Sequence, residues 1–251
     1  MTSSTKASLH VMEAKYRRSR RLNIVLGVIA AFLGVVVTAQ SLPGQSPTSA
    51  SAPSTSVSSG RSEEATGDPV FVRRDAGDPM AIGDVDAPIV LTQWTDLRCP
   101  YCAVFSRDTL PTLIKEYVDT GKVRIEIHDV AFFGEQSEDA AVAARAAAKQ
   151  GKFMEFVTAV YDAAPKGSHP DLPRKTLIAF ARQAGVPDID RYTADLDDPE
   201  LRAAAQESTR SAQQLGVNSV PFFVAGTTAL SGAQPLGTFR EFLDTALAQA
   251  E

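Results

Sequence analysis

The two cysteines of this 251-residue chain are separated by only two residues, as Cys99-Pro100-Tyr101-Cys102. They directly follow the apolar run 88–94, which is typical of a buried strand. Pro100 suits the first position of a helix, so we expect Cys99 at a helix N-terminus and Cys102 buried one turn further on. A helix N-terminus stabilises a thiolate through its unpaired N–H groups and its dipole. The motif therefore predicts a redox pair at a strand-to-helix turn, with Pro100 and Tyr101 tuning it.

Two other uses of the cysteines are less favoured. A structural zinc site needs four ligands, and the chain adds only three histidines to its cysteine pair, so we expect no metal. A purely structural disulfide would close a four-residue loop, which contributes about 2 kcal/mol against about 4.7 kcal/mol for a hundred-residue loop. A redox role is the better interpretation of the pair.

The first 39 residues resemble a membrane-targeting segment. Residues 1–21 carry six basic side chains and one acidic one, and residues 22–39 are apolar and uncharged. Eighteen helical residues span about 27 Å, close to the hydrocarbon thickness of about 30 Å. The basic flank predicts a cytoplasmic N-terminus and a single transmembrane anchor, with the remaining chain on the outer side of the cell membrane. Cleavage as a signal sequence, which would release a secreted domain, stays an alternative.

Composition changes again after the apolar run. Residues 40–68 are rich in Ser, Thr and Pro, which predicts a disordered spacer that cannot form a packed core. Residues 61–251 carry 19 basic and 29 acidic side chains, so a nucleic-acid partner is improbable. The 183 residues of 69–251 suit one compact domain.

Within that domain, strand patterns stand on both sides of a helical block. Alternation over 123–130 predicts a half-buried strand, with His128 on its polar side and without an assigned proton-transfer role. Four helical patterns follow, and then 220–230 predicts a hairpin. Thr238 and Glu241 have the spacing of a capping box, which predicts the start of a final helix. The helix that carries the cysteines is expected to continue to Ile114.

Three segments resemble the DsbA-like branch of the thioredoxin superfamily, and the actinobacterial membrane-anchored members in particular. They are residues 94–102, 216–224 and 230–235. The resemblance implies an α/β thioredoxin fold with an inserted helical domain. Its core would comprise about 69–132 and 217–251, and its insertion about 133–216. The 119-residue separation of Cys102 and Pro221 suits such an interrupted core.

The same resemblance implies that the Val220–Pro221 bond is cis and lies beside Cys99. Val220 and Pro221 would then bind substrate, with the Val220 backbone pairing with an extended client peptide. A proline at the start of an edge strand is the alternative interpretation. The family commonly has a buried acid where this chain has Gln93, and we expect Asp96 on a different part of the turn. No carboxylate is therefore assigned a catalytic role.

The function expected from these features is disulfide formation in exported proteins through Cys99 and Cys102. No bound cofactor is required. Partners would be unfolded exported proteins with reduced cysteines and a membrane reoxidant, DsbB-like or vitamin K epoxide reductase-like, and the protein itself would be a monomer. A disulfide reductase or isomerase with the same site stays open, as does a non-catalytic peptide-binding or chaperone module.

Overall fold

The computed structural model describes residues 68–250. The predicted basic segment 1–21, the anchor 22–39 and all but the last residue of the spacer 40–68 lie outside the described residues. Among residues 68–250, no helix is long and apolar enough to cross a membrane. The described residues belong to one compact unit.

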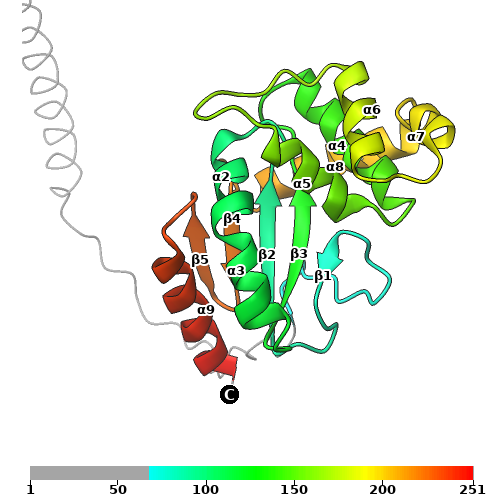
Figure 1. Cartoon of the computed structure of the whole chain (residues 1–251). Helices are drawn as coiled ribbons and strands as arrows, with labels where there is room; N and C mark the ends of the chain where they lie inside the picture. Colours follow the sequence, from blue (N-terminus) through cyan, green and yellow to red (C-terminus); the bar gives the residue numbers. More distant parts are fainter. Residues whose placement is uncertain (1–67, 251) are drawn as a thin grey trace, which may run out of the picture. The chain divides into compact units, whose positions relative to one another are not determined.

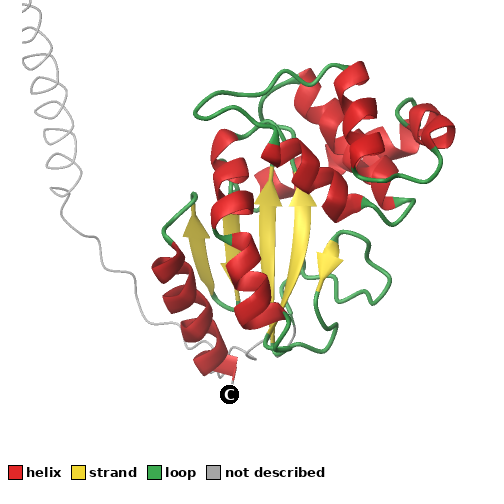
Figure 2. Cartoon of the chain, in the orientation of Figure 1, coloured by secondary structure: helices red, strands yellow, loops and turns green. Residues whose placement is uncertain are grey.

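A five-stranded mixed sheet is at the centre of the described chain, with the strand order β1-β3-β2-β4-β5 (Figures 1 and 2). The strands are β1 (Ala81–Ile82), β2 (Ile89–Thr95), β3 (Val123–Asp129), β4 (Phe222–Ala225) and β5 (Thr228–Ser231). β2 and β3 are parallel, with Ile89 opposite Val123 and Thr95 opposite Asp129. β4 joins β2 in antiparallel register, with Trp94 opposite Phe222. This pairing brings the late segment 220–225 beside the strand that ends at the cysteine motif.

The connection from β2 to β3 packs on one face of the sheet (Figure 1). It contains α2 (Pro100–Asp108), α3 (Leu110–Leu113) and the π-helical turn η1 (Ile114–Val118). The predicted single helix to Ile114 is therefore wrong, because it is interrupted at Thr109. Pro111 has no N–H to donate to the preceding turn, which explains the interruption. On the same face, α9 (Leu236–Ala250) brings Phe239 against Phe105 and Phe223, with ring centroids 5.0 and 4.9 Å apart.

Five helices lie together at one end of the sheet, in the part that the sequence predicts to be helical (Figure 2). They are α4 (Glu135–Ala148), α5 (Phe153–Asp162), α6 (Arg174–Gln183), α7 (Ile189–Asp195) and α8 (Pro199–Gln214). The predicted count of four is wrong because α7 is only seven residues long, too short to show an amphipathic period. The start of α9 at Leu236, before Thr238, also corrects the predicted capping box.

The second face of the sheet is covered as well, which corrects the prediction for β3. Trp94, Val130, Ala212 and Val217 form a separate core cluster, with Phe71 packed against it. Of the seven residues of β3, only His128 is not fully buried. Arg124 and Glu126, on the phase expected to face solvent, form an ion pair of 2.9 Å and are 4% and 0% exposed. Strand β3 is therefore buried on both faces and not half-buried.

Candidate redox site

Cys99 lies between the end of β2 and the start of α2, where it is the N-cap residue of the helix. Its backbone N–H donates to the Asp96 carbonyl at 2.9 Å, which closes the turn. The Cys102 backbone N–H donates to Cys99 Sγ at 3.3 Å, as a capping side chain requires. Pro100 is at the first turn of the helix, as its sequence position predicts. The expected placement of Cys99 at a helix N-terminus is confirmed.

The two thiols are free in this structure and have different surroundings. A hydrogen bond from the Cys102 thiol, together with the backbone N–H groups of Cys102 and Tyr101, lowers the pKa of Cys99 below its ordinary value, although burial and Asp96 oppose this. Burial raises the pKa of Cys102 well above its ordinary value, and the neighbouring Cys99 raises it further. Cys102 is 0% exposed, so it cannot meet a bulky partner. The lowered pKa of Cys99 and the raised pKa of Cys102 are the asymmetry expected of an attacking thiol and its buried neighbour.

The loop before β4 lies directly over Cys99. The Val220–Pro221 peptide bond is cis, and the Cys99 thiol donates to the Val220 carbonyl oxygen with an Sγ–O distance of 3.4 Å. Cys99 as a whole is only 2% exposed, and the half-buried Val220 lies against its sulfur. The structure thus brings Cys99, Cys102, Val220 and Pro221 together.

Tyr101 is arranged differently from the other three residues of the motif. Its side chain is 66% exposed, so the phenol faces solvent. Only its backbone N–H contributes to lowering the pKa of Cys99. The tuning at this position therefore comes from the main chain, and the exposed ring forms part of the surface next to Cys99.

Comparison with known proteins places this geometry in a family. A family model described as Thioredoxin matches residues 75–245. The chain belongs to the thioredoxin family. Its relatives include the probable disulfide bond formation protein D of Bacillus anthracis, 27% identical over 169 residues, which covers 62% of this chain and 77% of the relative. The disulfide bond formation protein D of Bacillus subtilis is 24% identical over 147 residues, covering 58% and 66% of the two chains.

Solved structures agree on the fold of this thioredoxin-family protein. Oxidised BdbD from Bacillus subtilis superposes with a TM-score of 0.63 at 21% identity, covering 68% of this chain and 94% of that one. Wolbachia pipientis α-DsbA1 superposes with a TM-score of 0.60 at 21% identity, covering 68% of this chain and 92% of that one. Together with the named relatives, these neighbours identify a DsbA-like protein disulfide oxidoreductase. The particular resemblance to actinobacterial membrane-anchored members stays a prediction.

Three polar residues behind the cysteines were not assigned a role from the sequence. Asp96 is fully buried and its charge raises the pKa of Cys99, so it lies closer to the site than expected. Thr95 and Tyr161 are each 1% exposed, and their hydroxyl oxygens are 2.5 Å apart. Tyr161 continues the apolar stripe of α5, which predicts a core residue, and only its hydroxyl group hints at a polar contact. His128 lies elsewhere, with its ring centroid 5.4 Å from that of Trp94 and tilted against it, and burial lowers its pKa to about 3.

Proposed function

We propose that this protein is a membrane-tethered, extracytoplasmic enzyme that forms disulfides in exported proteins through Cys99 and Cys102. The observation that carries the proposal is the asymmetry of the pair, with the pKa of Cys99 lowered and that of Cys102 raised. Stabilising the Cys99 thiolate favours the reduced protein, and a dithiol that is stable when reduced is a good oxidant when oxidised. The names of the relatives and the basic and apolar N-terminal segments support the same function.

The proposed reaction begins with the oxidised Cys99–Cys102 pair. A client thiolate attacks Cys99 Sγ, a client–Cys99 disulfide forms, and the electron pair of the broken bond goes to Cys102, which takes up a proton. A second client thiolate then attacks the client sulfur of the mixed disulfide. The client disulfide forms and Cys99 leaves as a thiolate, which the N-terminus of α2 stabilises. A membrane-bound oxidant, a quinone-linked protein in the proposed scheme, then removes two electrons from the pair, and the proton on Cys102 is released.

Client binding is proposed to use the main chain of Val220. Its carbonyl group accepts from Cys99 in the structure and becomes available when a client displaces that contact. Backbone pairing with an extended peptide requires no particular client sequence. Tyr101 adds an exposed apolar surface beside the sulfur. This arrangement suits an enzyme that acts on many unfolded proteins.

The direction of electron flow is tested by the reduction potential of the full chain, equilibrated against glutathione mixtures. An oxidase is expected between about −120 and −200 mV, whereas a value near −270 mV or below would indicate a reductase or a structural disulfide. In parallel, Cys99→Ser is expected to abolish oxidation of a reduced client protein. Unchanged activity of this variant would leave only the peptide-binding role.

Location is tested separately, with intact cells that carry the full chain. A membrane-impermeant maleimide is expected to label the reduced protein, and the Cys99→Ser, Cys102→Ser double variant is the control without thiols. Labelling that requires cell lysis would contradict the extracytoplasmic location. Fractionation of the same cells then separates an anchored protein, found in the membrane fraction, from a cleaved and released one.

A further inference from the structure

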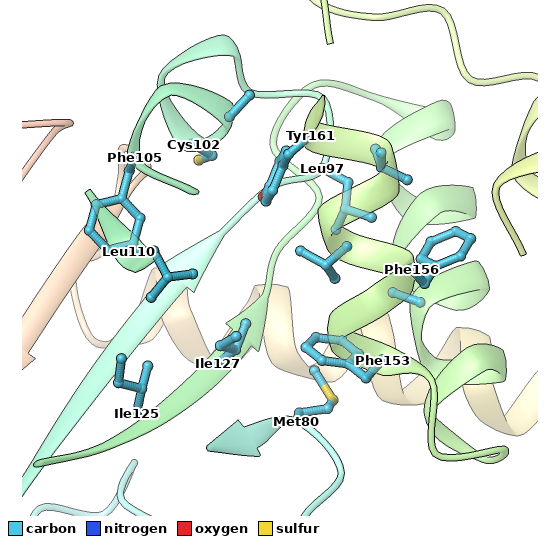
Figure 3. Packing of buried hydrophobic residues seen from close by; sticks show 14 of the residues in the cluster. Met80, Leu97, Cys102, Phe105, Leu110, Ile125, Ile127, Phe153, Phe156 and Tyr161 are labelled. Carbon is cyan, nitrogen blue, oxygen red and sulfur yellow. The ribbon is translucent and has the colours of Figure 1, made fainter. Parts of the chain in front are cut away.

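A pair of buried hydroxyl groups lies behind the inner cysteine. Thr95 is the last residue of β2 and Tyr161 lies on α5, so the pair joins the sheet to the inserted helices. Their oxygens are 2.5 Å apart, and the Tyr161 hydroxyl also lies 3.2 Å from the Asp96 carbonyl oxygen, to which it can donate. Figure 3 shows the Tyr161 ring between Leu97 and Cys102, with its oxygen toward the end of β2.

The Thr95 hydroxyl lies close enough to Cys102 to lower its pKa, against the larger effect of burial. Gln93 lies two residues earlier, on the same face of β2 as Thr95. Its amide carries no charge, and its Oε1 atom is buried without a hydrogen-bond partner among the described residues. The resemblance leads one to expect an acidic side chain at position 93, and this chain has none there. The polar side-chain group close to Cys102 is instead the Thr95 hydroxyl.

Breaking the Cys99–Cys102 bond leaves a negative charge on Cys102, in a place with no exposure to water. Such a charge is costly unless hydrogen-bond donors face it. We propose that Thr95 and Tyr161 are positioning residues for this step, and that they donate a chain of hydrogen bonds to the Cys102 thiolate as it leaves. In this chain Tyr161 donates to Thr95, and the Thr95 hydroxyl donates to Cys102 Sγ.

The same two hydroxyl groups suit the neutral thiol as well. The single proton of the Cys102 thiol is then donated to Cys99, the Thr95 hydroxyl still donates to Cys102 Sγ, and Tyr161 can donate to Thr95 or to the Asp96 carbonyl. Burial raises the pKa of Tyr161 well above its ordinary value, so the phenol keeps its proton in both arrangements. The pair therefore supplies hydrogen bonds and not a proton, and the proton that Cys102 finally takes up comes from solvent.

This inference rests on the proposed redox use of Cys99 and Cys102, but it holds for either direction of electron flow. It gives the inserted helices a part in the chemistry, because Tyr161 belongs to α5 and not to the thioredoxin core. A small dithiol tests it without any client protein. The result of this experiment therefore does not depend on the proposed direction of electron flow or on the proposed location of the protein.

The experiment measures how fast dithiothreitol reduces the oxidised full chain, by acid quenching and thiol alkylation. Thr95→Val, which keeps the shape but removes the hydroxyl, is expected to slow reduction about tenfold, as befits the loss of a hydrogen bond to a charged group. Tyr161→Phe is expected to slow it about threefold, because it acts through Thr95. Thr95→Ser keeps the hydroxyl and is expected to recover most of the wild-type rate.

Tyr192→Phe is the matched control, because Tyr192 is another fully buried tyrosine of the insertion, and its hydroxyl donates to the Leu177 carbonyl at 3.4 Å. Tyr192→Phe is expected to leave the rate of reduction unchanged. All four variants are expected to leave the rate at which reduced Cys99 is alkylated unchanged. Wild-type rates in both Thr95→Val and Tyr161→Phe would overturn the inference. Equal slowing in Thr95→Ser or Tyr192→Phe would also overturn it, because it would show a packing effect.

Discussion

Asp96 is a buried carboxyl group three residues before Cys99. Burial raises the pKa of Asp96, while backbone N–H groups oppose that shift. The N–H groups of Arg98 and Phe132 donate to its two carboxyl oxygens at 2.8 and 2.7 Å. The carboxyl group thus ties the cysteine turn to the segment that enters the helical insertion. Its charge also opposes the hydrogen bonds that favour the Cys99 thiolate.

Replacing Asp96 by Asn is therefore expected to lower the pKa of Cys99 further, because it removes the negative charge that raises it. The pH at which alkylation of reduced Cys99 is half-maximal should move to a lower value. Asp119→Asn is the control, because Asp119 is exposed at the end of η1. An unchanged or higher midpoint in Asp96→Asn would show that the charge of Asp96 does not reach Cys99.

The sequence was sufficient to identify the residues that meet at the front of the site. Cys99 and Pro100 follow local rules for helix starts, and the pairing with Val220 and Pro221 came from resemblance to a family. The residues behind the site could not be found in this way. Thr95, Asp96 and Tyr161 meet only because β2 and α5 pack together, and a tyrosine in an apolar helical stripe looks the same whether or not its hydroxyl has a partner.

Among the elements, the short strand β1 depends on one tight turn that follows it. Gly83 has a φ of +98°, and a Cβ built there would lie 2.8 Å from Val118 Cγ1 and 3.0 Å from the Val123 carbonyl oxygen. Gly121 also has a positive φ, of +72°, but an added Cβ would meet nothing within 4 Å. The two glycines therefore share a backbone requirement and differ in the space around them.

Gly83→Ala is expected to destabilise the protein by about 3 kcal/mol, because backbone strain and the clash with β3 add together. Gly121→Ala should cost only about 1 kcal/mol, for the strain alone. Urea unfolding of both variants gives the difference. If both variants lost the same free energy of unfolding, the contact between Gly83 and β3 would relax without an energetic cost.

Periodicity predicted the long helices because each has one buried stripe, as in α5. It failed where structure depends on distant contacts. β1 has two residues and exists through pairing with β3, and α7 buries only Tyr192 among its seven residues. A local sequence pattern could therefore predict neither β1 nor α7. The burial of Arg124 and Glu126 was also missed, because alternation shows which residues share a face but not what covers that face.

At the scale of the whole molecule, that buried ion pair holds the first described segment on the sheet. Glu126 accepts the backbone N–H groups of Arg73 and Arg74 at 2.7 and 2.8 Å, in addition to its ion pair with Arg124. Burial raises the pKa of Glu126, but these hydrogen bonds outweigh it and lower the pKa below 4.5. A lowered pKa means that the native state favours the charged form.

The stabilisation by Glu126 should be complete above pH 4.5, the unfolded value, and be lost as the pH falls through the lower folded pKa. Glu126→Gln is expected to reduce the free energy of unfolding at neutral pH by about 3 kcal/mol, because it leaves a buried arginine without its partner. It should also remove this part of the acid dependence. Denaturant unfolding at a series of pH values measures both effects.

Glu155→Gln is the control for this charge removal. Glu155 is exposed and pairs with Lys152 on the same helix end, so its loss should change the free energy of unfolding by less than about 0.5 kcal/mol. Comparable losses in the two variants would contradict a special role for the buried pair.

The pairing of β2 with β4 also sets an order of events during synthesis. Cys102 is made 119 residues before Pro221, and the whole helical insertion is made between them. A nascent chain that ends before Val220 lacks the carbonyl group that covers Cys99 in the finished fold. Its sulfur is then uncovered and free to react with other thiols. The enzyme is thus most exposed to unwanted disulfides in its own incomplete chain, and that period ends only when Val220 has been made and the chain has folded back onto β2.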